Sequence, residues 1–139
     1  MRKIKVAFVC VHNSCRSQMA EGWAKKLGSD LFEAYSAGTE NYPEVKPLAV
    51  EVMEEAGVDM SDHHPKLLTD IPEELDLLIT MGCNVVCPFV PNQHAEDWGL
   101  DDPSGGPIDG FRVTRDLIKE KVEALIERLK TGEIKLDLH

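Results

Sequence analysis

Near the N-terminus, a nearly continuous apolar run is followed by apolar residues at helical spacing. This change of pattern constrains the fold more than any other feature. Residues 4–9 are almost all apolar, which is typical of a strand buried on both faces of a parallel sheet. Over residues 17–27, Met19, Trp23 and Leu27 recur at the spacing of one helix face, and Gly28 follows as a helix end. A buried strand followed directly by an amphipathic helix predicts an α/β fold.

The same alternation continues along the chain. Residues 32–36 and the apolar run at 75–80 predict two more strands, and we expect a fourth strand at 94–98. Two segments have a helical period: residues 47–56, which begin with Pro47 and stop before Gly57, and residues 113–129. We expect segment 82–91 to be a loop or a frayed helical turn, and segment 103–107 to be a loop. The core face that we expect for the last helix comprises Leu117, Ile118, Val122, Leu125, Ile126 and Leu129. We therefore predict a four-stranded parallel sheet flanked by helices through right-handed crossovers, in a single domain of residues 1–139.

Composition and charge restrict the partners of this chain. Its 139 residues include 25 acidic and 15 basic side chains, and the net charge of −10 disfavours binding to nucleic acid or to an anionic membrane. No apolar run is long enough to span a bilayer, and Lys5 interrupts the N-terminal stretch that could suggest a signal peptide. We expect a cytoplasmic protein that acts as a monomer.

A cysteine, an arginine and a serine bracket the junction between the first strand and the first helix. Cys10 ends the apolar run, and Arg16 and Ser17 open the helix. The unpaired N–H groups and the dipole of a helix N-terminus favour negative charge, so they stabilise both the thiolate form of Cys10 and a bound oxyanion. The guanidinium of Arg16 can hold two oxygens of such an anion. We expect the oxyanion-binding loop to comprise Val11, His12, Asn13, Ser14, Cys15 and Arg16.

The alternative interpretation treats Cys10 as a small buried hydrophobe and Arg16 as an ordinary surface cation. The polar residues that flank them, among them Asn13, weigh against it. Cys83 and Asp102 also come soon after predicted strands, and the carboxyl ends of parallel strands meet at one edge of a sheet. We therefore expect Cys10, Cys83 and Asp102 to share one site.

The chain contains four cysteines, at positions 10, 15, 83 and 87. A cytosolic protein of this size does not keep structural disulfides, so catalytic or metal-binding thiols are the better interpretations. A zinc site would have to draw on histidines, for which the candidates are His12, His63, His64 and His94. Because there is no second cysteine-rich knuckle, we favour redox chemistry for Cys83 and Cys87 and expect no bound metal.

Several segments together resemble one known superfamily. The loop is followed by QMAEG at residues 18–22, and residues 36–38, 58–61, 96–98 and 101–103 read SAG, VDMS, EDW and DDP. These residues resemble the low-molecular-weight tyrosine phosphatases, and within that superfamily the thioredoxin-coupled arsenate reductases. The resemblance implies a flavodoxin-like, low-molecular-weight phosphatase-like fold, an enzyme that reduces arsenate to arsenite, and no cofactor.

The resemblance gives three cysteines successive roles. Cys10 attacks arsenate and expels hydroxide or water, Cys83 then attacks the sulfur of Cys10 so that arsenite leaves, and Cys87 attacks Cys83 and moves the disulfide outward to thioredoxin or a glutaredoxin. A phosphatase needs only Cys10, the loop and a general acid. A phosphotyrosine or small-molecule phosphatase is therefore the alternative function, and a protein that binds arsenic or zinc through the same thiols is a third.

The spacing of the two resolving cysteines is short. Only three residues separate Cys83 from Cys87, fewer than in the better-known relatives. On a helix, such a pair would lie on one face with its side chains poorly aimed for a disulfide. We therefore expect an irregular segment between Gly82 and Pro88, or one that unwinds when Cys83 turns inward.

The resemblance also implies a general acid. Asp102 stands before Pro103, as the general acid of the family does, and Asp101 is the competing assignment. The phosphatases follow this motif with aromatic residues. Residues 104–106 here read SGG instead, which favours a small inorganic anion over an aryl phosphate.

Residues around the nucleophile are expected to support it. We expect Ser17 to donate a hydrogen bond to the Cys10 thiolate and Asn13 to hold the loop in shape, and we assign no role to the side chains of His12 and Cys15. Some members of the family bind potassium, and the residues that match their ligands are Asn13, Glu21 and Ser36. Where those members have an aspartate ligand this chain has Lys66, whose ammonium we expect to replace the ion.

Overall fold

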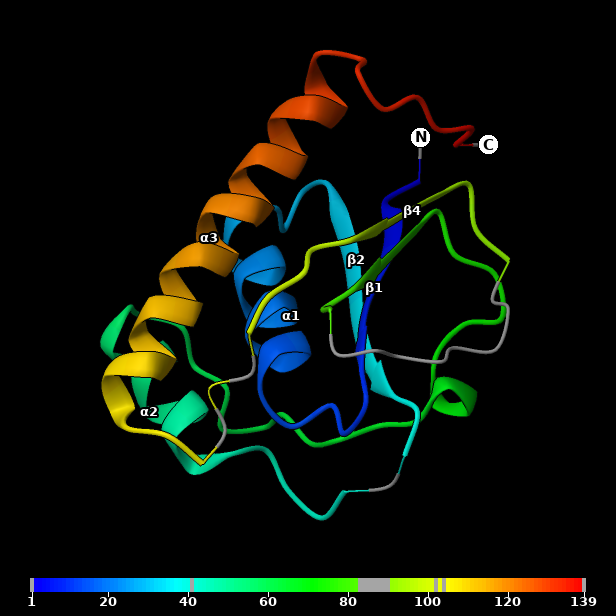
Figure 1. The fold of residues 1–139 in the computed structure, drawn as a ribbon. Helices are drawn as coiled ribbons and strands as arrows, with labels where there is room; N and C mark the ends of the chain where they lie inside the picture. Colours follow the sequence, from blue (N-terminus) through cyan, green and yellow to red (C-terminus); the bar gives the residue numbers. More distant parts are fainter. Residues whose placement is uncertain (1, 41, 83–90, 102, 104, 139) are drawn as a thin grey trace.

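The computed structural model describes residues 2–40, 42–82, 91–101, 103 and 105–138. This part of the chain contains four strands, three α-helices and one 3₁₀ turn, in the order β1-α1-β2-α2-η1-β3-β4-α3 (Figure 1). The strands are β1 (Ile4–Cys10), β2 (Phe32–Gly38), β3 (Leu77–Thr80) and β4 (His94–Asp97). The helices are α1 (Arg16–Leu27), α2 (Pro47–Glu55) and α3 (Ile108–Lys130), and the 3₁₀ turn, η1, covers Leu68–Asp70.

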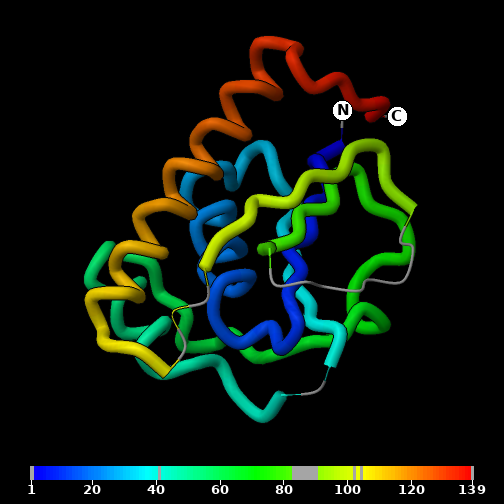
Figure 2. The backbone as a smooth tube through the Cα atoms, viewed as in Figure 1, coloured from blue at the N-terminus to red at the C-terminus, as the bar shows by residue number. Residues whose placement is uncertain are grey.

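The strands form one parallel sheet in the order β2-β1-β3-β4, which confirms the predicted four-stranded parallel sheet. Alternate side chains of β1 serve two hydrophobic clusters, because successive residues of a strand point to opposite faces. Val6 and Phe8 pack with residues of the three α-helices, whereas Ala7 and Val9 pack with Ile71 and its neighbours. Figures 1 and 2 show the same division, with the α-helices on one side of the sheet and η1 on the other.

The first strand, loop and helix follow the prediction closely. Helix α1 begins at Arg16, one residue before the expected start, and Gly28 closes it by donating its N–H to the carbonyl of Ala24 at 2.9 Å. Strand β2 extends two residues beyond the predicted end, because Gly38 still pairs with Cys10 in the parallel register. The ends of β1 and β2 are therefore level, and the loop after Cys10 lies against the end of β2.

Helix α3 departs from the prediction at its start and on one side of its core face. It begins at Ile108 instead of residue 113, directly after Pro107. Its buried stripe comprises Phe111, Thr114, Ile118, Val122 and Leu125. The expectation that Leu117 belongs to the core face is wrong, since Leu117 is 44% exposed and points about 100° around the helix from Ile118. Among the described residues, no helix is both long enough and apolar enough to cross a membrane.

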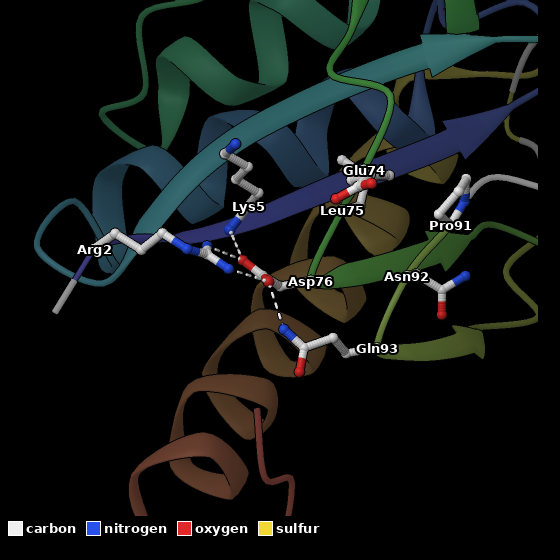
Figure 3. Close-up of a pocket in the computed structure, with 8 residues that line it drawn as sticks. All are labelled: Arg2, Lys5, Glu74, Leu75, Asp76, Pro91, Asn92 and Gln93. Carbon is white, nitrogen blue, oxygen red and sulfur yellow. Dashed lines mark hydrogen bonds and ion pairs between the residues drawn. The ribbon is translucent and has the colours of Figure 1, made fainter. Parts of the chain in front are cut away.

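A polar cluster holds the amino edge of the sheet together, at the opposite end from Cys10. Figure 3 shows Arg2, Lys5 and Gln93 converging on the buried carboxylate of Asp76. Arg2 Nη2 donates to it at 2.8 Å, the Lys5 main-chain N–H at 2.8 Å and Gln93 Nε2 at 2.7 Å. The hydrogen bond from Arg2 and the other two donors keep the pKa of Asp76 below its usual value despite burial. Gln93 also bonds the main chain of Asp137, so the cluster fixes both ends of the chain to β3 and β4.

Candidate active site

The loop between β1 and α1 turns back on Cys10, the last residue of β1. The Cys10 side chain is buried, and the loop bends at Asn13, whose φ of +54° lies in the left-handed region that asparagine tolerates. This bend brings the main-chain N–H of Asn13 to 3.2 Å from Cys10 Sγ. The sulfur thus accepts a hydrogen bond from the loop that follows it.

Ser17, in the first turn of α1, faces the same sulfur. Its Oγ lies 2.9 Å from Cys10 Sγ, so the predicted contact is confirmed. The Nδ2 atom of Asn13 donates to Ser17 Oγ at 2.8 Å. Because an amide nitrogen can only donate, this bond occupies an acceptor site of the hydroxyl and leaves the hydroxyl proton for the sulfur. An arrangement with two donors on sulfur stabilises a thiolate.

The segment after β2 fixes the outer side of the loop. The N–H of Glu40 donates to the carbonyl of Val11 at 2.9 Å, and the N–H of Lys46 donates to the carbonyl of Ser14 at 2.7 Å. Gly38 allows this approach, since a Cβ atom there would lie 2.6 Å from the Val11 carbonyl oxygen. Both loop carbonyls are thus engaged by neighbouring main chain, which removes two negative dipole ends from the surface offered to an anion.

Arg16 is buried and anchored at the carboxyl edge of the sheet. Its Nη1 donates to the carbonyl of Met81 at 3.0 Å and to that of Leu100 at 2.6 Å. These two residues follow β3 and β4 respectively. The interpretation of Arg16 as an ordinary surface cation is therefore wrong. Its side chain connects the start of α1 to the edge of the sheet at which Cys10 lies.

The two loop residues whose side chains have no assigned role, His12 and Cys15, differ in exposure. His12 is exposed and stacks on Tyr42 with ring centroids 4.7 Å apart, and its Nε2 lies 3.6 Å from Glu40. Cys15 is buried in the hydrophobic core.

A buried carboxylate, Glu21, lies on α1 one turn beyond the loop. Burial raises its pKa, but hydrogen bonds from Lys25 at 2.6 Å and from Ser36 at 2.5 Å, together with the charge of Lys66, outweigh burial and lower it. Lys66 Nζ lies 3.4 Å from Glu21 Oε1 and 3.5 Å from Ser36 Oγ. An ammonium group thus occupies the space among the oxygens of Glu21 and Ser36, two of the groups expected to hold a potassium ion.

Two residues that were not predicted from the sequence join this region to the loop, Gln18 and His63. The side chain of Gln18 is fully buried and reaches both Asn13 and the main chain of His64. His63 Nδ1 lies 2.9 Å from Gln18 Oε1. In sequence His63 stood out only as a candidate zinc ligand. Within the ranges that the structure describes, no group of three or more His, Cys, Asp or Glu side chains could hold a metal ion.

A sequence model of the low molecular weight phosphotyrosine protein phosphatase family matches residues 5–134. The chain is 44% identical over 127 residues to the arsenate reductase of Staphylococcus aureus strain Newman, covering 88% of this chain and 96% of that protein. It is 42% identical over 132 residues to arsenate reductase 2 of Staphylococcus haemolyticus, covering 92% of this chain and 100% of that protein. The chain belongs to the arsenate reductases of this phosphatase family.

Solved structures of arsenate reductases have the same fold. One in a phosphate-binding state is 42% identical with a TM-score of 0.83 and covers 91% of this chain and 98% of its own. A thioredoxin-dependent arsenate reductase of Corynebacterium glutamicum is 31% identical with a TM-score of 0.77 and covers 94% of this chain and 63% of its own. The superfamily resemblance inferred from the loop and its neighbouring segments is thus confirmed.

Three residues that the family resemblance makes catalytic lie outside the described part of the chain: Cys83, Cys87 and Asp102. The chain approaches these positions beside the loop. Met81 and Leu100, which flank them in sequence, both accept hydrogen bonds from Arg16. Gly82 and Gly99 pack directly together, since a Cβ on Gly82 would lie 2.4 Å from Gly99 Cα. The described residues that flank these positions therefore lie at the carboxyl edge of the sheet.

Proposed function

We propose that this chain reduces arsenate to arsenite with Cys10 as the nucleophile. The observation that carries the proposal is the environment of Cys10 Sγ, which accepts the N–H of Asn13 at 3.2 Å and lies 2.9 Å from Ser17 Oγ at the N-terminus of α1. Such donors stabilise a thiolate that can attack arsenic. The matched relatives named as arsenate reductases support arsenate as the substrate.

In the first step the Cys10 thiolate attacks arsenic, an S–As bond forms, and an As–O bond breaks. The departing oxygen leaves as hydroxide, or as water when Asp102 gives it a proton. The loop of residues 11–16 and the guanidinium of Arg16 hold the remaining oxygens. The anchoring of Arg16 on Met81 and Leu100 supports this role, because it fixes the guanidinium at the edge of the sheet where the anion must bind.

In the second step the Cys83 thiolate attacks the sulfur of Cys10. An S–S bond forms, the S–As bond breaks, and its electron pair goes to arsenic, which leaves as arsenite in the +3 state. Cys87 then attacks Cys83, so that the Cys10 thiolate is released and the disulfide joins Cys83 to Cys87. The two electrons that arsenic gains come from the thiols of the chain.

The reductant that restores the thiols is thioredoxin or a similar dithiol protein in the cytoplasm. Two resolving cysteines can present a finished disulfide to such a protein. The similarity to a thioredoxin-dependent arsenate reductase supports the same choice.

Reduction of one arsenate per chain, without any external reductant, tests the mechanism. Fully reduced protein mixed with arsenate should yield about one equivalent of arsenite, and peptide mapping should then find the Cys83–Cys87 disulfide. The Cys87→Ser variant should stop with Cys10 joined to Cys83. Arsenate that remains unreduced while all thiols stay titratable would contradict the proposal.

Phosphatase activity is the second candidate, because the matching family is named for phosphotyrosine phosphatases. It would use Cys10, the loop and Asp102 without the resolving cysteines. Hydrolysis of an aryl phosphate by the Cys83→Ser variant at the rate of the unaltered chain, together with no arsenate reduction by either, would favour it.

A further inference from the structure

We propose that Gln18 and His63 are positioning residues for the nucleophile: they hold a directed chain of hydrogen bonds that delivers the Ser17 proton to the sulfur of Cys10. The hydrogen bonds of the two side chains go to Asn13, to His64 and to each other, not to the sulfur. They act through Asn13, and the consequence for turnover rests on the proposed arsenate reduction.

The main chain fixes the orientation of the Asn13 amide. The N–H of Lys66, which can only donate, points at Asn13 Oδ1 at 2.8 Å. The other end of the amide is therefore Nδ2, which donates to Ser17 Oγ at 2.8 Å. The Ser17 proton is then directed to Cys10 Sγ, 2.9 Å away.

Three carbonyl oxygens fix the orientation of the Gln18 amide. Its Nε2 lies 2.9 Å from Asn13 Oδ1, 3.1 Å from the Asn13 main-chain oxygen and 2.8 Å from that of His64. All three can only accept, so the nitrogen of the amide must face them. Gln18 Oε1 consequently faces His63 Nδ1 at 2.9 Å, and His63 must carry a proton on Nδ1.

The surroundings of His63 keep the ring in place in either charge state. Its side chain is 7% exposed, and its Nε2 lies 3.8 Å from Glu21 Oε2. Burial lowers the pKa of His63; Lys25 and Lys66 lower it further, and Glu21 and Asp62 oppose them. The neutral ring must carry its proton on Nδ1, and the protonated ring carries one there as well. The bond to Gln18 is thus kept at any pH at which the fold persists.

The chain of bonds spans two segments that are far apart in sequence. Residues 63–66 supply the His63 ring, the His64 carbonyl and the Lys66 N–H, and these hold the amides of Gln18 and Asn13. Removing the Nδ1 donor of His63 would leave Gln18 Oε1 buried without that hydrogen bond, and the Gln18 amide would be free to rotate or shift. The Asn13 amide, whose Oδ1 accepts from Gln18 Nε2, would then hold the Ser17 hydroxyl less firmly.

The tautomer of His63 is the first test, and it uses the unaltered protein. Nitrogen-15 NMR of the imidazole in the neutral state should show the proton on Nδ1. A neutral His63 that carries its proton on Nε2 would overturn the proposal, because Gln18 Oε1 could not accept from it. This measurement needs no arsenate, so its outcome is separate from the fate of the proposed function.

The second test measures how fast iodoacetamide alkylates Cys10 across pH, with mass spectrometry to identify the modified peptide. His63→Leu removes the donor, His63→Asn offers an amide N–H near the position of Nδ1, and Asp62→Asn is a control for charge beside the same ring. We expect His63→Leu to move the midpoint of the pH profile upward and to slow alkylation at neutral pH about threefold to tenfold, the effect of weakening one charge-assisted hydrogen bond.

His63→Asn should restore most of the midpoint and Asp62→Asn should keep it. A folded His63→Leu variant with the midpoint of the unaltered chain would contradict the proposal and leave His63 a structural residue. Equal upward shifts in the Leu and Asn variants would also contradict it, since the donor would then not matter.

Discussion

Lys66 offers the most quantitative test of the site, because its ammonium pairs with a buried carboxylate. Lys66 Nζ is 3.4 Å from Glu21 Oε1, and the Lys66 side chain is only 18% exposed. At that distance and an effective dielectric constant of about 20, the attraction is about 5 kcal/mol. Lys25 stays 2.6 Å from the other oxygen of Glu21, and an alanine variant no longer has to desolvate an ammonium. We therefore expect Lys66→Ala to lower the free energy of unfolding by about 1–3 kcal/mol.

Potassium should recover part of that loss. Lys66→Ala leaves the oxygens of Glu21, Ser36 and His64 around an open space, because all three lie within 3.5 Å of the present Nζ. The assay is urea unfolding in equal concentrations of KCl or NaCl. The unaltered chain should give the same result in both salts, and the variant should be more stable in KCl.

Lys25→Ala is the matched control, since Lys25 pairs with the same carboxylate but has a side chain that is 53% exposed. Its loss should be under about 1 kcal/mol and independent of the salt. Specific stabilisation of the unaltered chain by potassium would contradict the replacement of the ion by the Lys66 ammonium. A Lys66→Ala variant as stable as the unaltered chain would contradict it as well.

Three further predictions concern single residues. Ser17→Ala should lower kcat for arsenate about tenfold without unfolding the chain, because Cys10 Sγ loses a donor at 2.9 Å; an unchanged steady-state rate would contradict this. Asp76→Asn should lower the free energy of unfolding in urea at neutral pH by about 1–3 kcal/mol, a range kept low because the Arg2 side chain is 37% exposed to solvent. Since folding lowers the pKa of Asp76, its contribution is present above about pH 4 and is lost as pH falls through the folded value, so the stability of the variant should fall less steeply in acid. Gly82→Ala should lower the free energy of unfolding by about 2 kcal/mol or more, measured as a lower melting temperature, because a Cβ there would meet Gly99 Cα at 2.4 Å and φ is +82°.

The sheet and the nucleophile loop could be predicted because their signals are local. A run of apolar residues from position 4 predicts a buried strand, and Cys10, Arg16 and Ser17 follow where the apolar spacing changes from that of a strand to that of a helix. Gly28 ended the helix as expected, since its N–H closes the last turn. Each of these features depends on residues within one or two turns of each other.

The parts that could not be predicted depend on contacts between distant segments. Gln18 is a polar residue in the first turn of a helix, and nothing in the local sequence distinguishes it from a solvated side chain. Its burial follows from residues 63–66, which lie against α1 only in the folded chain. The expectation that Leu117 is part of the core was wrong for a related reason. Several apolar residues lie near one another on α3, and packing against α1 and α2 selects the stripe through Ile118.

The same limit applies to the direction of hydrogen bonds. The sequence indicated that Ser17 would face Cys10, but the source of the second bond to the hydroxyl, Asn13 Nδ2, depends on the left-handed turn at Asn13 and on the N–H of Lys66. Such a network is set by geometry and not by residue type.

In the proposed relay, Cys10, Cys83 and Cys87 pass electrons from a dithiol protein to arsenate. The most direct test is consumption of NADPH in the presence of thioredoxin and thioredoxin reductase, with and without arsenate, for the unaltered chain and for Cys10→Ser, Cys83→Ser and Cys87→Ser. We predict oxidation of NADPH that depends on arsenate for the unaltered chain and is abolished in each variant. Full activity in Cys83→Ser or Cys87→Ser, or no arsenate-dependent oxidation by the unaltered chain, would contradict the relay.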